Sequence, residues 1–288
     1  MKNLIFMRDD LEDSYGILKL QDKILEIMVY IDDFCRQYGI TYYLMGCYAL
    51  GAMRHGGFIP WDDDLDIFMD YPNYIKFKEC CEKYLDTDKF YFQCEDTKEL
   101  PYFFSKLRMN GTTCISAVDV KSKEAHYGIF VDIMCLNNAA KSDFGKKVQY
   151  YAAGMLKAKA CSKTKYQAKG FVKKVALLVS KIVVVGPIKK MLLHMVRKYN
   201  RRESNMVAHL FGRAKYKNSF YPATIFEKQR FVSFEKCALA VPSGAEEYLK
   251  LRYGANYMDM PSEETKAVYQ SHATVWDVDN NYTCYLDS

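Results

Sequence analysis

Four aspartates crowd the segment RHGGFIPWDDDLDIF, residues 54–68, where the apolar flanks predict a buried strand. Asp64 and Asp66 are two residues apart, so on a strand their side chains would leave the same face. Two carboxylates held that close repel each other and raise each other's pKa unless a cation lies between them. The spacing predicts a bound divalent metal, and the alternative is an acidic turn exposed to solvent.

All-oxygen sites of this kind suit Mg²⁺ or Mn²⁺, which complete their coordination with water and substrate phosphates. Asp62, Asp64 and Asp66 also alternate as in a calcium-binding EF-hand loop. That interpretation fails because position six is Ile67 instead of glycine and position twelve is Asn73 instead of glutamate.

A third carboxylate, Asp132, lies between Val131 and Ile133 in the apolar run HYGIFVDIMCL. A lone carboxylate is costly to bury without a partner. If this strand lies beside the strand at 64–69, Asp132 completes a three-carboxylate metal site. A salt bridge in the core is the alternative.

Several other residues have the chemistry to hold phosphate. Gly46 ends a predicted strand and Cys47 begins a predicted helix, where backbone N–H groups can bind an anion. Arg54 and His55 would neutralise further phosphate charge. On a later strand two cations alternate on one face and would either join this site or face solvent; they are Lys106 and Arg108.

The elements around these residues predict an α/β (α+β) fold with a mixed sheet flanked by helices. Apolar residues at helical spacing predict a helix over 17–34 that ends at Gly39. Pro72 fits the first turn of a helix ending near Leu85. Strands are predicted at 40–45, 65–69, 90–94, 102–109, 112–115 and 128–136, with a short helix over 48–55.

Composition indicates a globular protein of 288 residues with an uneven charge distribution. Residues 141–217 contain 20 Lys or Arg and two acidic residues, a net charge of +18, whereas the remainder carries −12. This basic segment is predicted to be helical throughout, interrupted at Gly186-Pro187. The ten cysteines form no CxxC pair and the first residues show no signal peptide, so we expect reduced thiols in a cytoplasmic protein.

The most apolar stretch, VALLVSKIVVVGPI at 175–188, is too short to span a bilayer, which needs about 20 residues. It is either a buried core helix or an interfacial helix facing anionic lipid. The second interpretation rests on the cations that flank it, namely Lys173, Lys174, Lys189, Lys190, Arg197, Lys198, Arg201 and Arg202. Few aromatic residues alternate with these lysines, which argues against nucleic acid as the partner.

The run YYLMGCYALGAMRHGGFIPWDDDLDIFM resembles the signature of the LicD family of phosphocholine transferases, which includes the fukutin-type polyol-phosphate transferases. The resemblance continues in FFSKLRMNGTT, HYGIFVDIM and VPSGAEEYLKLRYGANYMDMP. It implies a nucleotidyltransferase-like fold forming a single catalytic domain over residues 1–288, interrupted by the basic insertion at 141–217.

By this resemblance, Asp64 and Asp66 hold Mg²⁺ on the diphosphate of a CDP-alcohol, and Asp132 completes the metal site and activates the acceptor. Binding of substrate would involve Gly46, Cys47, Arg54, His55, Trp61, Lys106 and Arg108. The implied reaction moves phosphocholine from CDP-choline to a sugar hydroxyl of a lipid-linked cell-surface glycan, such as lipopolysaccharide or teichoic acid, and releases CMP.

Other functions stay open. These are a ribitol or glycerol phosphate transferase, a glycosyltransferase that uses the Asp-x-Asp pair on a sugar nucleotide, and a non-catalytic protein that binds membrane or glycan. One departure from the family pattern bears on the donor, since Gly46-Cys47-Tyr48 replaces the usual Gly-Gly-Ser or Gly-Gly-Thr. Aromatic side chains nearby would either cage a quaternary ammonium or pack in the core; they are Tyr42, Tyr43, Phe58 and Trp61.

Overall fold

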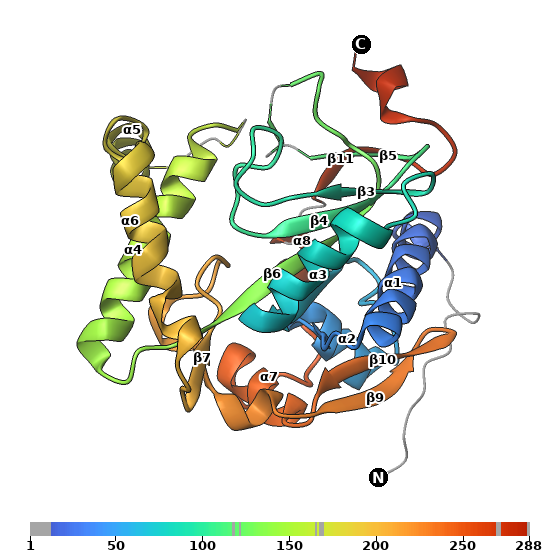
Figure 1. Cartoon of the computed structure of the whole chain (residues 1–288). Coiled ribbons are helices and arrows are strands. Elements are labelled where there is room, and N and C mark those ends of the chain that lie inside the picture. The colour runs from blue at the N-terminus through green and yellow to red at the C-terminus, as the bar shows by residue number, and fades with distance from the viewer. Residues whose placement is uncertain are drawn as a thin grey trace.

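A computed structural model describes residues 13–116, 119–120, 122–164, 166, 170–268 and 272–286, and it has the predicted mixed α and β architecture (Figure 1). The N-terminal residues for which we predicted no signal peptide lie largely outside this range. The central sheet has the strand order β1-β2-β6-β4-β3. These strands span Tyr43–Leu44, Asp66–Asp70, Phe130–Asn138, Ser105–Met109 and Phe90–Gln93 respectively.

Strand β6 is the centre of this sheet and is buried along almost its whole length. It pairs parallel with β2 and antiparallel with β4. Its far end pairs with β7 (Met206–Ala208), which in turn pairs with β8 (Phe220–Pro222). Its polar side chains Asp132 and Asn137 are removed from bulk water, and helices α1 (Leu18–Tyr38) and α3 (Tyr71–Tyr84) pack against this strand.

Two helices pack against the sheet, as the apolar spacing predicts: α1 (Leu18–Tyr38) and α3 (Tyr71–Tyr84) lie side by side in Figure 1. Helix α1 ends at Gly39, whose φ of 59° is the left-handed conformation that glycine favours. Helix α3 begins where the Asp70 carboxylate accepts a hydrogen bond from the Asn73 amide, with Pro72 in its first turn. The last residue of β2 therefore also fixes the start of α3.

Smaller elements complete the main core. Helix α2 (Gly46–His55) contacts α7 (Ala245–Tyr253) and the hairpin of β9 (Gln229–Phe234) and β10 (Cys237–Pro242). Strand β11 (Ala273–Asp277) pairs with β5 (Thr113–Ser116) and brings the C-terminal part of the chain beside the sheet. The remaining short elements are α8 (Glu263–Val268), η3 (Tyr216–Asn218), η4 (Ala223–Phe226) and η5 (Tyr282–Tyr285).

The basic segment forms three helices at one side of the sheet (Figure 1): α4 (Asp143–Cys161), α5 (Phe171–Val183) and α6 (Gly186–Arg197). Helices α4 and α6 share a second apolar core, which includes Leu156 of α4 and Leu192 and Val196 of α6. The prediction of helix throughout this segment is wrong beyond η2 (Lys198–Arg201). Residues 206–208 instead form β7, because pairing with β6 and β8 satisfies their backbone groups.

Ion pairs join these helices to the sheet domain. The Arg197 guanidinium of α6 donates to both carboxylate oxygens of Glu95, at 2.8 and 3.0 Å, and Glu95 is almost fully buried. Lys189, also on α6, pairs with Asp96. A buried pair of this kind costs several kcal/mol to break, because removal of one partner leaves an unpaired charge. The helices are therefore anchored near both ends of α6 and through β7.

Gly51 explains one part of the sequence motif around the aspartates. A Cβ added to this α2 residue would lie 2.4 Å from the carbonyl oxygen of Gly57, well inside contact distance. The backbone of the Gly-Gly turn thus lies directly against α2, and this contact positions the start of the aspartate-rich segment. In α4, a Cβ added to Gly154 would meet nothing within 4 Å.

We expect Gly51→Ala and Gly154→Ala to change stability in opposite directions. Alanine favours a helix over glycine by about 1 kcal/mol, so Gly154→Ala should raise the free energy of unfolding by about 0.5–1 kcal/mol. Gly51→Ala should lower it by about 1–3 kcal/mol, because the turn must move away from the helix. Urea denaturation of both variants measures this, and a stabilised Gly51→Ala would contradict the close packing.

Candidate active site

Three charged residues meet across three neighbouring strands. Asp66 of β2 and Asp132 of β6 are register partners in the parallel pair, and Lys106 of β4 is the register partner of Asp132 on the other side. The Lys106 Nζ lies 2.6 Å from Asp132 Oδ1, and both side chains are about nine-tenths buried. The conditional prediction that the strand of Asp132 lies beside the strand of Asp66 is confirmed.

Burial of these carboxylates disfavours their charged forms. Burial raises the pKa of Asp66 well above its usual range, and the nearby charges of Asp64 and Asp132 raise it further. The pKa of Asp132 is also raised by burial, although the Lys106 ammonium opposes that shift. The cations near Asp66 that oppose the rise of its pKa are Lys106 and His272.

Asp64 lies just before β2, which begins at Asp66, so the two are not on one strand as the spacing suggests. A histidine from far along the chain reaches it: His272 Nδ1 lies 3.3 Å from Asp64 Oδ2 and 2.9 Å from Asp63 Oδ1. The hydrogen bond with Asp63 raises the pKa of His272 to about 9, so its ring is positively charged at neutral pH. Figure 1 shows β11, which follows His272, beside β5.

Within the described part of the chain, one group of carboxylate and imidazole atoms is close enough to share a metal ion. Its members are Asp62, Asp63, Asp64 and His272, whose ligand atoms lie within 4.8 Å of one another. Asp63 is buried and also accepts a hydrogen bond from the Ala273 amide, so it holds the start of β11 in place. Asp64 is thus the residue that this group shares with the predicted metal triad.

The Gly46-Cys47-Tyr48 turn places two further side chains at the carboxylates. The Tyr48 hydroxyl donates to Asp64, where the family pattern has a serine or threonine. Burial raises the pKa of the Cys47 thiol well above its usual range, and the adjacent Asp62, Asp64 and Asp66 add to this effect. Cys47 therefore stays protonated and is no thiolate nucleophile at neutral pH.

Part of the chain is similar to known proteins. Residues 39–148 match the family described as "LicD/FKTN/FKRP, nucleotidyltransferase domain", a segment that holds α2, β2, β4 and β6. Over this segment the chain is similar to LicD-family nucleotidyltransferases. The chain is also 47% identical over 53 residues to the lipopolysaccharide cholinephosphotransferase LicD of Haemophilus influenzae, a match that covers 18% of this chain and about one fifth of that relative.

At the N-terminus of α2, the glycine of the Gly46-Cys47-Tyr48 run has a left-handed conformation. Gly46 has a φ of 54°, and an added Cβ would lie 3.2 Å from the Tyr253 hydroxyl. Its amide donates to the Tyr248 hydroxyl at 3.0 Å. A donor phosphate at this predicted anion site would have to compete with Tyr248 for that amide.

The other end of α2 carries two of the predicted substrate-binding residues, Arg54 and His55, and a third, Trp61, follows beyond the helix. Arg54 donates to the carbonyl oxygens of Tyr257 and Asp259 at 3.3 and 2.9 Å. Burial, with the Arg54 charge, lowers the pKa of His55 to about 4, so this ring is neutral at pH 7 and can contribute a hydrogen bond but no positive charge. Trp61 packs edge-on to His55.

The two cations of β4 differ in their surroundings, and neither lies on a solvated face. Lys106 reaches Asp132, as described above. Arg108 is fully buried and donates to the Gln93 side chain at 2.8 Å and to the Gly128 carbonyl at 2.7 Å. The Arg108 guanidinium therefore holds β3 and the segment before β6 against β4.

The idea of an aromatic cage built from four residues is wrong for three of them. Tyr42, Tyr43 and Phe58 are buried in the main core. The Tyr42 hydroxyl donates to Asp32, and the Tyr43 hydroxyl donates to the Phe226 carbonyl oxygen. Trp61 is only half-buried, and the Lys266 ammonium lies 4.8 Å from the centre of its ring.

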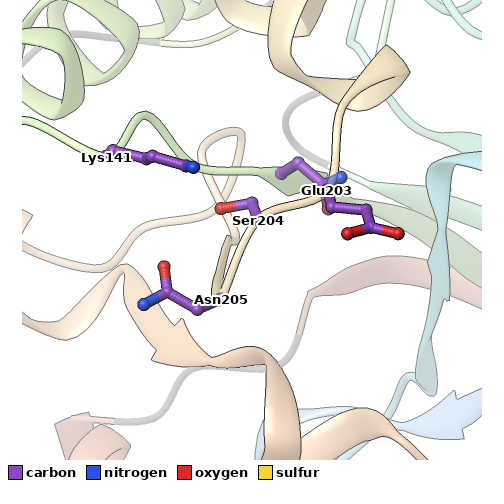
Figure 2. A pocket seen from close by; sticks show the side chains of 5 residues that line it. Lys141, Glu203, Ser204 and Asn205 are labelled. Carbon is purple, nitrogen blue, oxygen red and sulfur yellow. The ribbon is translucent and has the colours of Figure 1, made fainter.

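Two cavities of about 730 and 700 Å³ lie at the opposite end of β6, away from Asp132. The first is lined by Asn138, Lys141, Glu203, Ser204 and Asn205, and Figure 2 shows Lys141 and Glu203 on opposite sides of Ser204. The second is strongly basic and includes Lys190, Arg197 and Arg201 of the helical insertion. None of the predicted site residues outside the insertion lines either cavity.

The HYG motif before β6 is structural in this domain. His126 Nδ1 accepts a hydrogen bond from the Gly128 amide at 3.0 Å, and Nε2 lies 3.0 Å from Asn110 Oδ1. Its ring stacks on Tyr91. Burial and the Arg108 charge lower the pKa of His126 to about 4. Protonation of this ring therefore destabilises the folded protein relative to the unfolded chain.

We expect His126→Gln to weaken the loss of stability in mild acid. The ordinary pKa of histidine is about 6.5. Between about pH 6.5 and pH 4, His126 is therefore protonated in the unfolded chain but neutral in the folded chain. Stability therefore falls as pH drops through this window, by at most about 1.4 kcal/mol per pH unit for one proton. The variant should show a shallower fall in urea denaturation across these pH values.

The control for this measurement is His194→Gln, a change at an exposed histidine of α6. It should leave the pH dependence as in the unmodified chain. If the free energy of unfolding of His126→Gln fell with pH as steeply as that of the unmodified chain, protonation of His126 would not oppose folding. His55 and His209, whose pKa values burial lowers to about 4 and about 3, account for acid sensitivity that remains.

Proposed function

We propose that the protein is a Mg²⁺-dependent transferase that moves phosphocholine from CDP-choline to a sugar hydroxyl of a cell-surface glycan and releases CMP. The observation that carries this proposal is the register of Asp66, Asp132 and Lys106 across three adjacent strands. The family match and the printed activity of the Haemophilus influenzae relative support it. The matched region is short, so donor and acceptor are proposals.

Asp64, Asp66 and Asp132 supply the all-oxygen ligand set that Mg²⁺ prefers, and their ligand atoms would have to move closer together than in this structure to share one ion. Asp66 is buried among like charges, and the pKa of its carboxyl is raised accordingly, which is the condition that a divalent cation relieves. We assign Asp64, Asp66 and Asp132 as the metal ligands, with Mn²⁺ as the alternative ion. A bound Mg²⁺ would neutralise the donor diphosphate and polarise its phosphoryl oxygens.

Side chains of the protein carry out the proton transfer that accompanies the reaction. Asp132 accepts the proton of the acceptor hydroxyl, whose oxygen forms a bond to the phosphorus that bears choline. The bond between that phosphorus and the CMP oxygen breaks, and CMP leaves with the electron pair. The Lys106 ammonium at 2.6 Å keeps the Asp132 carboxylate oriented for this role.

Two features bear on donor binding. Arg54 lies at the end of α2, where its charge would meet phosphate, in keeping with the positioning and charge neutralisation that phosphoryl transfer needs. The alcohol is taken from the printed activity of the Haemophilus influenzae relative, a cholinephosphotransferase, which favours choline over the uncharged alcohols ribitol and glycerol.

We expect Asp66→Asn to abolish transfer without loss of stability. Release of CMP from CDP-choline with Mg²⁺ should fall by about a hundredfold or more, because a metal ligand is lost. Since the folded-state pKa of Asp66 is raised, its ionised form opposes folding at pH 7, and the neutral amide should leave stability unchanged or increase it. CMP release and thermal unfolding of the same variant test both statements.

Asp70→Asn is the matched control, because Asp70 lies on the same face of β2, four residues further along, and caps α3. Asparagine also caps helices well, so this variant should retain activity and fold. Full CMP release by Asp66→Asn would contradict the proposal. Turnover of UDP-glucose instead of CDP-alcohols would favour a glycosyltransferase.

A further inference from the structure

Helix α5 presents an apolar stripe to solvent. Phe171, Leu178 and Ile182 are 81%, 60% and 68% exposed, and they share one helical face with Val175. Val179 and Val183, also exposed, broaden the stripe. The interpretation of this stretch as a buried core helix is therefore wrong, since α5 rests on α4 while most of its apolar residues stay outside the core.

The charge around this stripe is positive. Lys173, Lys174 and Lys181 of α5 are exposed and form no ion pair with other described residues. In the sequence, no aspartate or glutamate occurs between Asp143 and Glu203. Other cations of the insertion are already used, since Lys189 and Arg197 pair with Asp96 and Glu95 of the sheet domain.

The dimensions of α5 fit a helix that lies in a membrane surface. Its 13 residues extend only about 20 Å, whereas a bilayer core is about 30 Å thick. Across the described residues, every helix is too short or too polar to cross a membrane. An amphipathic helix with lysines beside an apolar face instead lies in the headgroup region, with that face in the acyl chains.

We propose that α5 docks the protein on an anionic membrane surface, with its apolar stripe inserted and Lys173, Lys174 and Lys181 among the lipid headgroups. A second copy of the chain is a poorer occupant, because the lysines of two copies would repel each other. The membrane contact stands independently of the transfer reaction. Its use, which is to hold the enzyme at a lipid-linked acceptor, rests on the proposed function.

Co-sedimentation with vesicles tests this surface directly. The full chain should sediment with phosphatidylcholine vesicles that contain 30% phosphatidylglycerol and stay in solution with phosphatidylcholine alone. Leu178→Glu/Ile182→Glu should lose this binding, and Leu251→Glu, a change at an exposed leucine of α7, should retain it. Both changed residues of α5 are exposed, so the variant should unfold thermally like the unmodified chain.

The contribution of charge is measured with Lys173→Gln/Lys174→Gln. Each lysine near an anionic surface contributes enough that loss of two should lower the partition coefficient by roughly thirtyfold. Raising the ionic strength should also lower the partition coefficient, because salt screens the attraction between the lysines and the anionic lipid.

Three results would overturn the proposal. The first is no sedimentation with either vesicle, and the second is unchanged binding by Leu178→Glu/Ile182→Glu. The third is a dimer in analytical ultracentrifugation that this variant converts to a monomer, which would make the stripe a contact between copies. Because vesicle binding needs no nucleotide, an inactive but membrane-bound protein would contradict the transfer reaction alone.

Discussion

The parallel pairing of β2 with β6 is the constraint on which the rest of the site depends. It makes Asp66 and Asp132 register partners inside a sheet, where burial raises the pKa of both carboxyls and the charge of Asp132 raises that of Asp66 further. Such an arrangement is costly unless cations compensate for it. Lys106 compensates one carboxylate and the protonated His272 faces Asp63 and Asp64, which leaves the charge that we assign to Mg²⁺.

The sequence predicts the strands and helices around the site, because the patterns that indicate them lie within the segments that form them. Alternation gives the strands, Gly39 and Pro72 limit the helices, and a lone aspartate in the apolar run of β6 requires a partner. Nothing in the sequence near Asp63 indicates His272, because that contact forms only when β11 pairs with β5 more than 150 residues earlier in the chain. The same holds for Tyr248, whose hydroxyl accepts the Gly46 amide hydrogen bond.

Side-chain direction is the second limit of sequence analysis. The four aromatic residues near the aspartates have the composition of a cage, yet three of them are needed for the core and only Trp61 remains partly exposed. Conversely, the apolar run of α5 reads equally well as buried or interfacial, and only the packing of α4 against α6 shows that the core of the insertion closes largely without it. In both cases burial depends on which surfaces neighbouring elements already occupy.

Whether this site binds a CDP-alcohol together with a metal ion is tested most directly by ligand-induced thermal stabilisation. A ligand that binds only the folded state raises the unfolding temperature. We predict that CDP-choline raises it in the presence of Mg²⁺ but not with a chelator, and more than CDP-ribitol, CDP-glycerol or UDP-glucose does. Equal stabilisation with and without Mg²⁺, or no response to any of these nucleotides, would contradict the account.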